Sequence, residues 1–251
     1  MRLKSFLGLS LSLAKAEFKL KNEGSYFGII WYILGPILTF LLLLGIFSDR
    51  LGNNIAYYPL YLLLGIVMFN LFQNTTTEAT KAISIHRGII KSIKFPLEAL
   101  IGSITLKAIF SHIFEILIFF IILKSFGLPL VGILFYPLIL GVFCIFIFGV
   151  SLIFSALNVY FVDLENIWVF ASRVLWFATP IFYEIGNQTK LFLINLFNPL
   201  YFFIEISRSI LIYNKIPDTW VILGSLGYTL ISIIIGFLVF NRLKHKFAEM
   251  V

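Results

Sequence analysis

Long stretches without charged residues alternate with short polar segments along the chain. A helix needs about 20 mostly apolar residues to cross about 30 Å of hydrocarbon. Four stretches satisfy this without a single Asp, Glu, Lys or Arg, and two further apolar stretches carry ionisable groups. The six candidate spans are residues 24–48, 51–77, 97–123, 131–158, 167–183 and 219–241. The pattern predicts an all-α polytopic membrane protein with six transmembrane helices, forming one domain over residues 1–251.

Composition and charge support the same class of protein. Of 251 residues, 60% are hydrophobic and 12% are charged, against roughly 45–50% and about 25% in soluble domains. The net charge of +7 reflects topology rather than nucleic-acid binding, because twelve Lys and Arg lie in segments on one side of the predicted spans and five on the other. Basic residues concentrate on the cytoplasmic side. We therefore expect an inner-membrane protein that contacts membrane lipids and has both termini in the cytoplasm.

Two segments do not fit a plain bundle of spans. Residues 1–23 are basic and carry apolar residues near helical spacing, which predicts an amphipathic helix in the cytoplasmic interface; the alternative is a basic leader that only sets topology. Residues 184–218 are apolar but contain no span-length helix, and Asn198 and Pro199 divide them into two short helices. Such pairs usually re-enter the membrane from one side, or else lie flat on it. Glu205 and Arg208 are close enough on the second helix to pair.

The loop over residues 78–96 has the character of a docking segment. Ile89, Ile90 and Ile93 form an apolar stripe beside Arg87, Lys91 and Lys94, just before Pro96. A short amphipathic helix of this kind docks in a groove of a soluble partner, or lies against anionic lipid.

Ionisable groups inside spans are the default functional candidates in a membrane protein. At about 1.5 Å per residue, Lys107 and Arg173 lie roughly 13 and 12 Å from the cytoplasmic end of their spans. Two cations at one depth favour an aqueous path for an anionic phosphate. The alternatives are snorkelling to the interface or pairing with Asp163, Glu165 or backbone carbonyls. The aromatic candidates for sugar contact along such a path are Trp31, Tyr32 and Phe177.

Motifs for soluble-type catalysis are missing from the sequence. It contains no GxxxxGK[ST] phosphate loop, no paired-cysteine metal spacing, no HExxH and no GxSxG. Its single cysteine, Cys144, lies in an apolar run and has no partner for an intrachain disulfide. We expect no catalytic residue, no metal site and no cofactor in this chain, and any ATP must be bound by another subunit.

Several segments together resemble the membrane subunits of type-2 ABC exporters of O-antigen, capsular polysaccharide or teichoic acid. The most specific are NVYFVDL at residues 158–164 and WFATPIFY at 176–183. The others are YFGIIWYILGP at 26–36, FNPL at 197–200, RSIL at 208–211 and the segment 89–96. One departure is Val162, which stands where the family usually has an arginine before the loop aspartate.

The resemblance implies a homodimer bound to two copies of a separate nucleotide-binding subunit, which would hold ATP and magnesium. The loop near Arg87 would engage that ATPase, and the outer half-helices would cap an export channel for a lipid-linked glycan. A drug or lipid exporter on the same scaffold is one alternative. A membrane-embedded enzyme acting on a polyprenyl substrate, with Glu115, His112 or Arg173 in its site, is another.

Overall fold

The computed structural model describes residues 3–23, 30–52, 54–92, 95–186 and 188–250, and within these ranges it contains helices and no strand. The predicted all-α class is confirmed. The main helices are α1 (Leu3–Asn22), α2 (Ile30–Phe47), α3 (Tyr58–Ile85), α4 (Arg87–Ser92), α5 (Leu97–Ser125), α6 (Tyr136–Asn158), α7 (Leu164–Ala178), α8 (Thr189–Leu196), α9 (Pro199–Leu211), α10 (Thr219–Leu243) and α11 (Phe247–Met250). Short π or 3₁₀ turns occupy Ser48–Gly52, Leu130–Leu134 and Lys244–Lys246.

Four helices in the described part are long and apolar enough to cross a membrane. They are α2 with the turn after it, α5, α6, and α10 with the turn after it; the bent pair α8 and α9 would raise the number to five if it formed one span. Helix α7 has 15 residues, or about 22 Å, and α3 carries a polar run in its second half. The predicted six spans are therefore not confirmed by length and composition alone.

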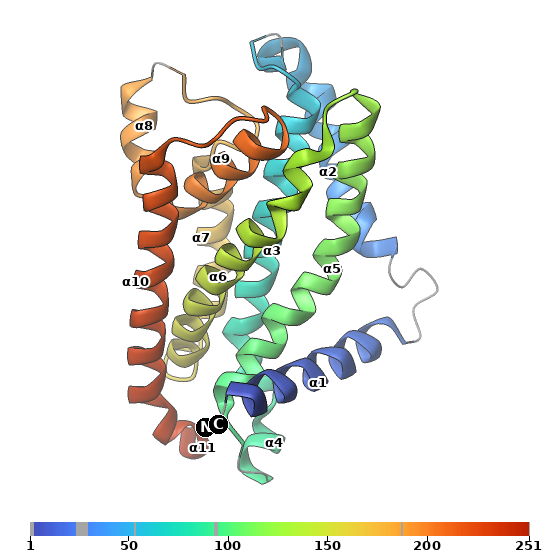
Figure 1. Cartoon of the computed structure of the whole chain (residues 1–251). Coiled ribbons are helices and arrows are strands. Elements are labelled where there is room, and N and C mark those ends of the chain that lie inside the picture. Colours follow the sequence, from blue (N-terminus) through green and yellow to red (C-terminus); the bar gives the residue numbers. More distant parts are fainter. Residues whose placement is uncertain (1–2, 24–29, 53, 93–94, 187, 251) are drawn as a thin grey trace.

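Helix α3 occupies the centre of the bundle. It packs against α2, α5, α6, α7 and α9, and most of its first half is buried. Figure 1 shows it between the flanking helices, with α10 at one edge of the molecule and α2 and α5 toward the other. Because α3 is central, its polar second half is surrounded by other helices, although the sequence places part of it in a loop.

The polar run of α3 moves a boundary expected from the sequence. The second apolar stretch ends at residue 77, yet the helix continues to Ile85. The hydroxyls of Thr75, Thr76 and Thr80 donate to the carbonyls of Leu71, Phe72 and Thr76, one turn earlier. These bonds satisfy the three buried hydroxyls within the helix, so the polar run can pack among other helices without an unpaired hydroxyl. The first part of the 78–96 segment thus belongs to α3.

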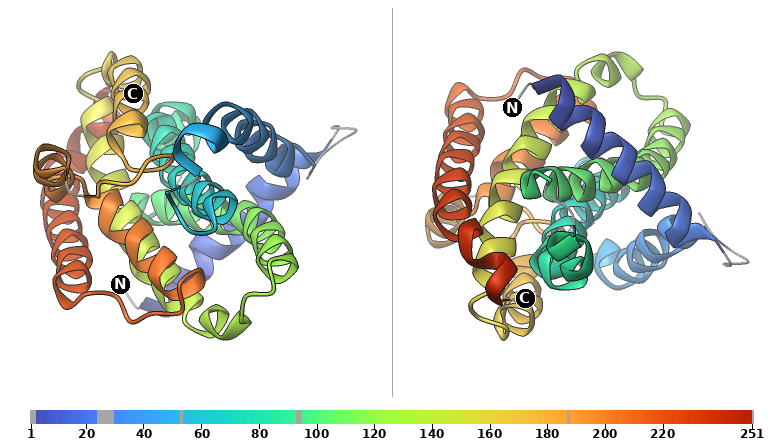
Figure 2. Two further views of the ribbon diagram at one scale, coloured as in Figure 1. Left: turned by 90° about the horizontal axis from the view of Figure 1, so that it is seen from above. Right: turned by 90° about the horizontal axis from the view of Figure 1, so that it is seen from below.

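Helices α1, α4 and α11 gather at one end of the bundle (Figure 1). Seen from that end, α1 crosses beneath the bundle (Figure 2) and packs mainly on α5. Ser10 and Ala14 face the protein, whereas Leu7, Leu11 and Leu20 are exposed. The helix predicted within residues 1–23 is therefore present over Leu3–Asn22, and the first two residues lie outside the described residues.

Candidate functional site

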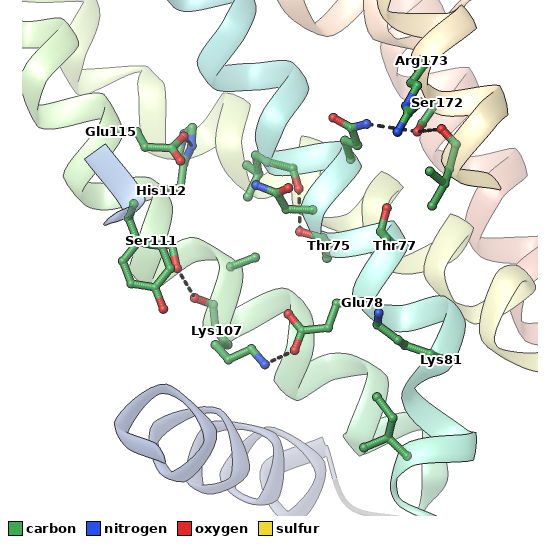
Figure 3. Close-up of a pocket in the computed structure, with 17 residues that line it drawn as sticks. Thr75, Thr77, Glu78, Lys81, Lys107, Ser111, His112, Glu115, Ser172 and Arg173 are labelled. Atoms are coloured by element: carbon green, nitrogen blue, oxygen red, sulfur yellow. Dashed lines mark hydrogen bonds and ion pairs between the residues drawn. The ribbon is translucent and has the colours of Figure 1, made fainter. Parts of the chain in front are cut away.

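A cavity of about 710 Å³ lies between α2, α3, α5 and α7, and most of the residues in its wall are polar or charged. Three of the five residues predicted to line a path are in its wall, namely Tyr32, Lys107 and Arg173. The last two are labelled in Figure 3. Trp31 and Phe177 lie on the same helices, α2 and α7, with more than half of each side chain exposed, but they are not among the residues that line the cavity. The remaining polar wall comprises Gln73, Asn74, Thr75, Thr77, Glu78, Lys81, Ser111, His112, Glu115 and Ser172.

Lys107 is buried and compensated by two carboxylates. Its Nζ donates to Glu17 Oε2 on α1 at 2.7 Å and also to Glu78 on α3. Neither partner follows from local sequence, because they lie 90 and 29 residues away. Of the two carboxylates that the sequence offered as partners, Glu165 instead accepts from Lys81 at 3.2 Å. The carboxylate partners of Lys107 are therefore Glu17 and Glu78 rather than Asp163 or Glu165.

Arg173 differs from Lys107 in its surroundings. Its side chain is exposed, and no salt bridge among the described residues includes it. The neighbouring Ser172 is buried and accepts a hydrogen bond from Gln73 on α3 at 3.0 Å. The indole of Trp168, one turn earlier, donates to Thr76 at 3.1 Å. These bonds fix α7 against α3 and so hold Arg173 at the cavity wall.

A histidine and a glutamate one turn apart on α5 line another part of the cavity, away from Arg173 (Figure 3). His112 Nε2 lies 2.5 Å from the hydroxyl of Tyr136, and its Nδ1 lies 3.7 Å from Glu115 Oε2. Both side chains are buried. The membrane-enzyme alternative needs a further acid or base facing this pair, and Arg173, which never acts as a base in proteins, lies elsewhere on the wall.

The predicted docking segment forms a helix of its own, α4. Arg87, Ile89 and Lys91 are exposed, whereas Ile90 packs against the apolar cluster that joins α3, α5 and α6. Residues 93 and 94, and with them the predicted contacts of Ile93 and Lys94, lie outside the described residues. Helix α4 thus presents both a basic and an apolar group outward while one isoleucine anchors it.

The two short helices expected from the Asn198-Pro199 break are α8 and α9, and they are bent by 106°. Asn198 caps α9 by accepting from Leu200 N at 3.1 Å, and its amide donates to Thr179 at the end of α7 at 2.8 Å. Pro199 occupies the first turn of α9, where a missing N–H costs nothing. Local sequence therefore determines the break and the start of the second helix, and the bond to Thr179 attaches that start to the end of α7.

Arg208 is fully buried and binds backbone rather than a carboxylate. Its guanidinium donates to the carbonyls of Pro180 at 2.7 Å, Ile181 at 2.9 Å and Tyr61 at 3.0 Å. Its Cζ also lies 3.2 Å from the centroid of the Tyr61 ring. The local pair with Glu205 suggested by the spacing is not among the ion pairs of the described residues. Arg208 instead joins α9 to α3 and to the segment after α7.

Comparison with known proteins places this architecture in a family. The family described as "ABC-2 type transporter" matches residues 9–212. The O-antigen export system permease protein RfbA of Myxococcus xanthus is 23% identical over 249 residues, covering 97% of this chain and 95% of the relative. RfbA of Klebsiella pneumoniae is 27% identical, covering 96% and 94%. The polysialic acid transport protein KpsM of Escherichia coli is 23% identical, covering 83% of each. This chain therefore belongs to the ABC-2 type transporter family.

Proposed function

We propose that this chain is the permease subunit of an exporter that moves a lipid-linked polysaccharide across the cytoplasmic membrane. The observation that carries the proposal is similarity over nearly the whole chain to proteins named O-antigen export permeases, with 97% of the chain covered in one case. A separate subunit hydrolyses ATP with magnesium, and two copies of it bind a homodimer of this chain. The absence of a phosphate loop from the sequence agrees with this division of labour.

The proposed topology has six spans in one domain over residues 1–251. Helices α3 and α7 join the four long apolar helices, while α8 and α9 form the outer re-entrant segment within residues 184–218. Both termini and α4 face the cytoplasm, which is supported by the gathering of α1, α4 and α11 at one end (Figure 1). Lys and Arg are also more frequent in the segments assigned to that side.

In this topology α4 is the docking helix for the ATPase, within the coupling segment 78–96. Arg87 and Lys91 supply charge, Ile89 supplies an apolar contact, and Ile93 and Lys94 continue the segment. Charge reversal at Arg87 and Lys91 together should at least halve the ATPase that co-purifies with the chain, since electrostatic complementarity sets partner choice. The matched control reverses Lys124 and Lys190, which are exposed and lie on the opposite side in this topology. Equal co-purification of both double variants would contradict the docking role.

The proposed path runs along the polar cavity. Arg173 is its candidate cation for substrate contact, and Lys107 is a second cation in the same wall. Tyr32 is its candidate ring inside the cavity, and Trp31 and Phe177 are its candidate rings on the exposed faces of α2 and α7. An anionic phosphate next to a sugar matches guanidinium chemistry together with the hydroxyl and amide groups of the wall. The outer residues Asn198, Pro199, Glu205 and Arg208 shape the exit.

Removal of this chain from its host tests the function. Cells without it should lose surface glycan and accumulate lipid-linked glycan at the inner face of the membrane, and the wild-type chain should reverse both effects. Normal surface glycan in the deleted strain would overturn the proposal. Loss of resistance to a drug, or of a lipid from the outer leaflet, with unchanged glycan would instead favour an exporter of drugs or lipids.

A further inference from the structure

Four ionisable side chains from three helices meet where α1 crosses the bundle, next to α4. Lys107 on α5 contacts Glu17 on α1 and Glu78 on α3, and Glu17 also faces His86 at the end of α3. We propose that Lys107 and Glu17 are positioning residues that couple α4 to α1 and α5, and that Lys107 does not contact the substrate. The inference rests on the proposed function in one respect, namely that α4 docks the ATPase.

The positive charge of Lys107 is already neutralised by carboxylates of the protein. Only 7% of its side chain is exposed, and two of the three Nζ protons are directed at carboxylates. One positive charge between two negative charges leaves the cluster with a net charge of about −1 when His86 is neutral. An anionic headgroup that approached this cluster would meet excess negative charge, so electrostatics disfavours Lys107 as its binding group.

Glu17 is the group that joins the three helices. Its Oε2 accepts from Lys107 at 2.7 Å, and its Oε1 lies 3.6 Å from His86 Nε2. The other ring nitrogen of His86, Nδ1, lies 2.9 Å from the carbonyl oxygen of Ala82. His86 caps the carboxyl end of α3 and directly precedes Arg87, the first residue of α4. A single carboxylate therefore contacts α5 and the α3–α4 junction.

Helix α1 has further contacts that make it a rigid part of this end. Phe18 meets Phe110 on α5 with ring centroids 5.8 Å apart. Gly102 on α5 faces Ser10 so closely that a Cβ there would lie 2.9 Å from the serine Oγ. Because α1 is held along α5 in this way, a displacement of α4 either moves α1 and α5 with it or separates Glu17 from Lys107 and His86. The buried ion pair makes separation costly, which favours joint movement.

Arg173 provides the contrast within the same cavity. It lines the wall without any salt bridge among the described residues, whereas Lys107 and Lys81 each have a carboxylate partner. Lys107 and Arg173, which look equivalent in the sequence, therefore have different roles. Arg173 keeps its charge for a passing anion, and Lys107 uses its charge to position helices.

Glu17→Gln is the decisive variant, because it is a mild change that leaves Lys107 and its contact with Glu78 in place. We expect the complex to assemble with its ATPase and to hydrolyse ATP, while export per ATP falls about tenfold, within the roughly 5–150-fold range typical of coupling between sites. Lys107→Gln should give the same defect, and the two changes together should be no worse than either alone. Arg173→Gln, the matched control, should lower export and ATP hydrolysis together.

Normal export by Glu17→Gln beside defective export by Lys107→Gln would overturn the inference, since that pattern is the signature of a lysine that contacts substrate. A reversed set, Glu17→Lys with Lys107→Glu and Glu78→Gln, keeps an ion pair between α1 and α5 but places a carboxylate in the cavity. It should recover at least half of the lost coupling, and failure to exceed Lys107→Gln would contradict the positioning role. A wild-type complex that hydrolyses ATP but moves no glycan would refute the proposed substrate, and the same variants would then be compared by export of the cargo that the complex does move.

Discussion

Replacement of Arg208 by methionine should weaken the outer half of the protein more than any exposed substitution. Methionine fills much of the same volume but removes three hydrogen bonds to the carbonyls of Pro180, Ile181 and Tyr61. Hydrogen bonds to a charged donor contribute about 1.5–3 kcal/mol each. Part of this gain is offset in the native protein by the cost of burying a guanidinium. In the variant, the carbonyl of Pro180 also keeps a longer hydrogen bond of 3.4 Å from the Tyr61 hydroxyl.

We therefore expect a net loss of about 3 kcal/mol for Arg208→Met, below the gross sum because of that offset. At about 2–4 °C per kcal/mol for a chain of this size, the Tm in detergent should fall by about 6–12 °C. Thermal unfolding followed by size-exclusion chromatography measures this directly. The control is Arg173→Met, the same substitution at an exposed arginine with no salt bridge among the described residues, which should leave the Tm within about 1 °C, as surface changes usually do. Equal Tm values for the two variants would refute the role given to the three carbonyl contacts.

Three further outcomes follow from the same geometry. Gly65→Ala should lower the Tm, because its Cβ would lie 2.8 Å from Arg208 Nη2 and 3.2 Å from the Ile181 carbonyl, whereas Gly35→Ala, with nothing within 4 Å, should not. Asn198→Ala should destabilise the protein by about 1 kcal/mol through loss of the α9 cap, and Asn198→Ser should recover most of this in a denaturation series. In a Cys144→Ala background, an impermeant maleimide added outside should label Phe192→Cys but not Ile89→Cys, and the reverse pattern would invert the topology.

The sequence predicted well those features that depend on neighbouring residues. The Asn198-Pro199 pair ends one helix and caps the next, so the α8–α9 break was predictable. Helix α4 was predictable from its isoleucine stripe before Pro96. The presence of helix α1 followed from residue spacing alone. In each case the residues that predict the feature lie within a few positions of the feature itself.

The polar contacts between distant segments could not be predicted in the same way. Lys107 pairs with Glu17 and Glu78, which lie far from it in the sequence. Arg208 binds backbone carbonyls, which the pattern of side chains along the sequence does not reveal. The end of α3 was misplaced because the sequence shows a polar run but not that its threonines bond to their own helix. The depth estimate did place Lys107 and Arg173 at one cavity, but their opposite electrostatic surroundings emerge only when the helices are packed.

Translocation in a defined membrane tests the central claim most directly. The chain would be reconstituted with its ATPase in liposomes carrying a lipid-linked glycan in the leaflet that α4 faces, and the glycan reaching the other leaflet would be measured with a membrane-impermeant lectin. We expect transfer that requires ATP, both subunits and an intact α4. Retention of the glycan in its original leaflet despite active hydrolysis, or cleavage of its lipid link by this chain alone, would contradict the proposed function.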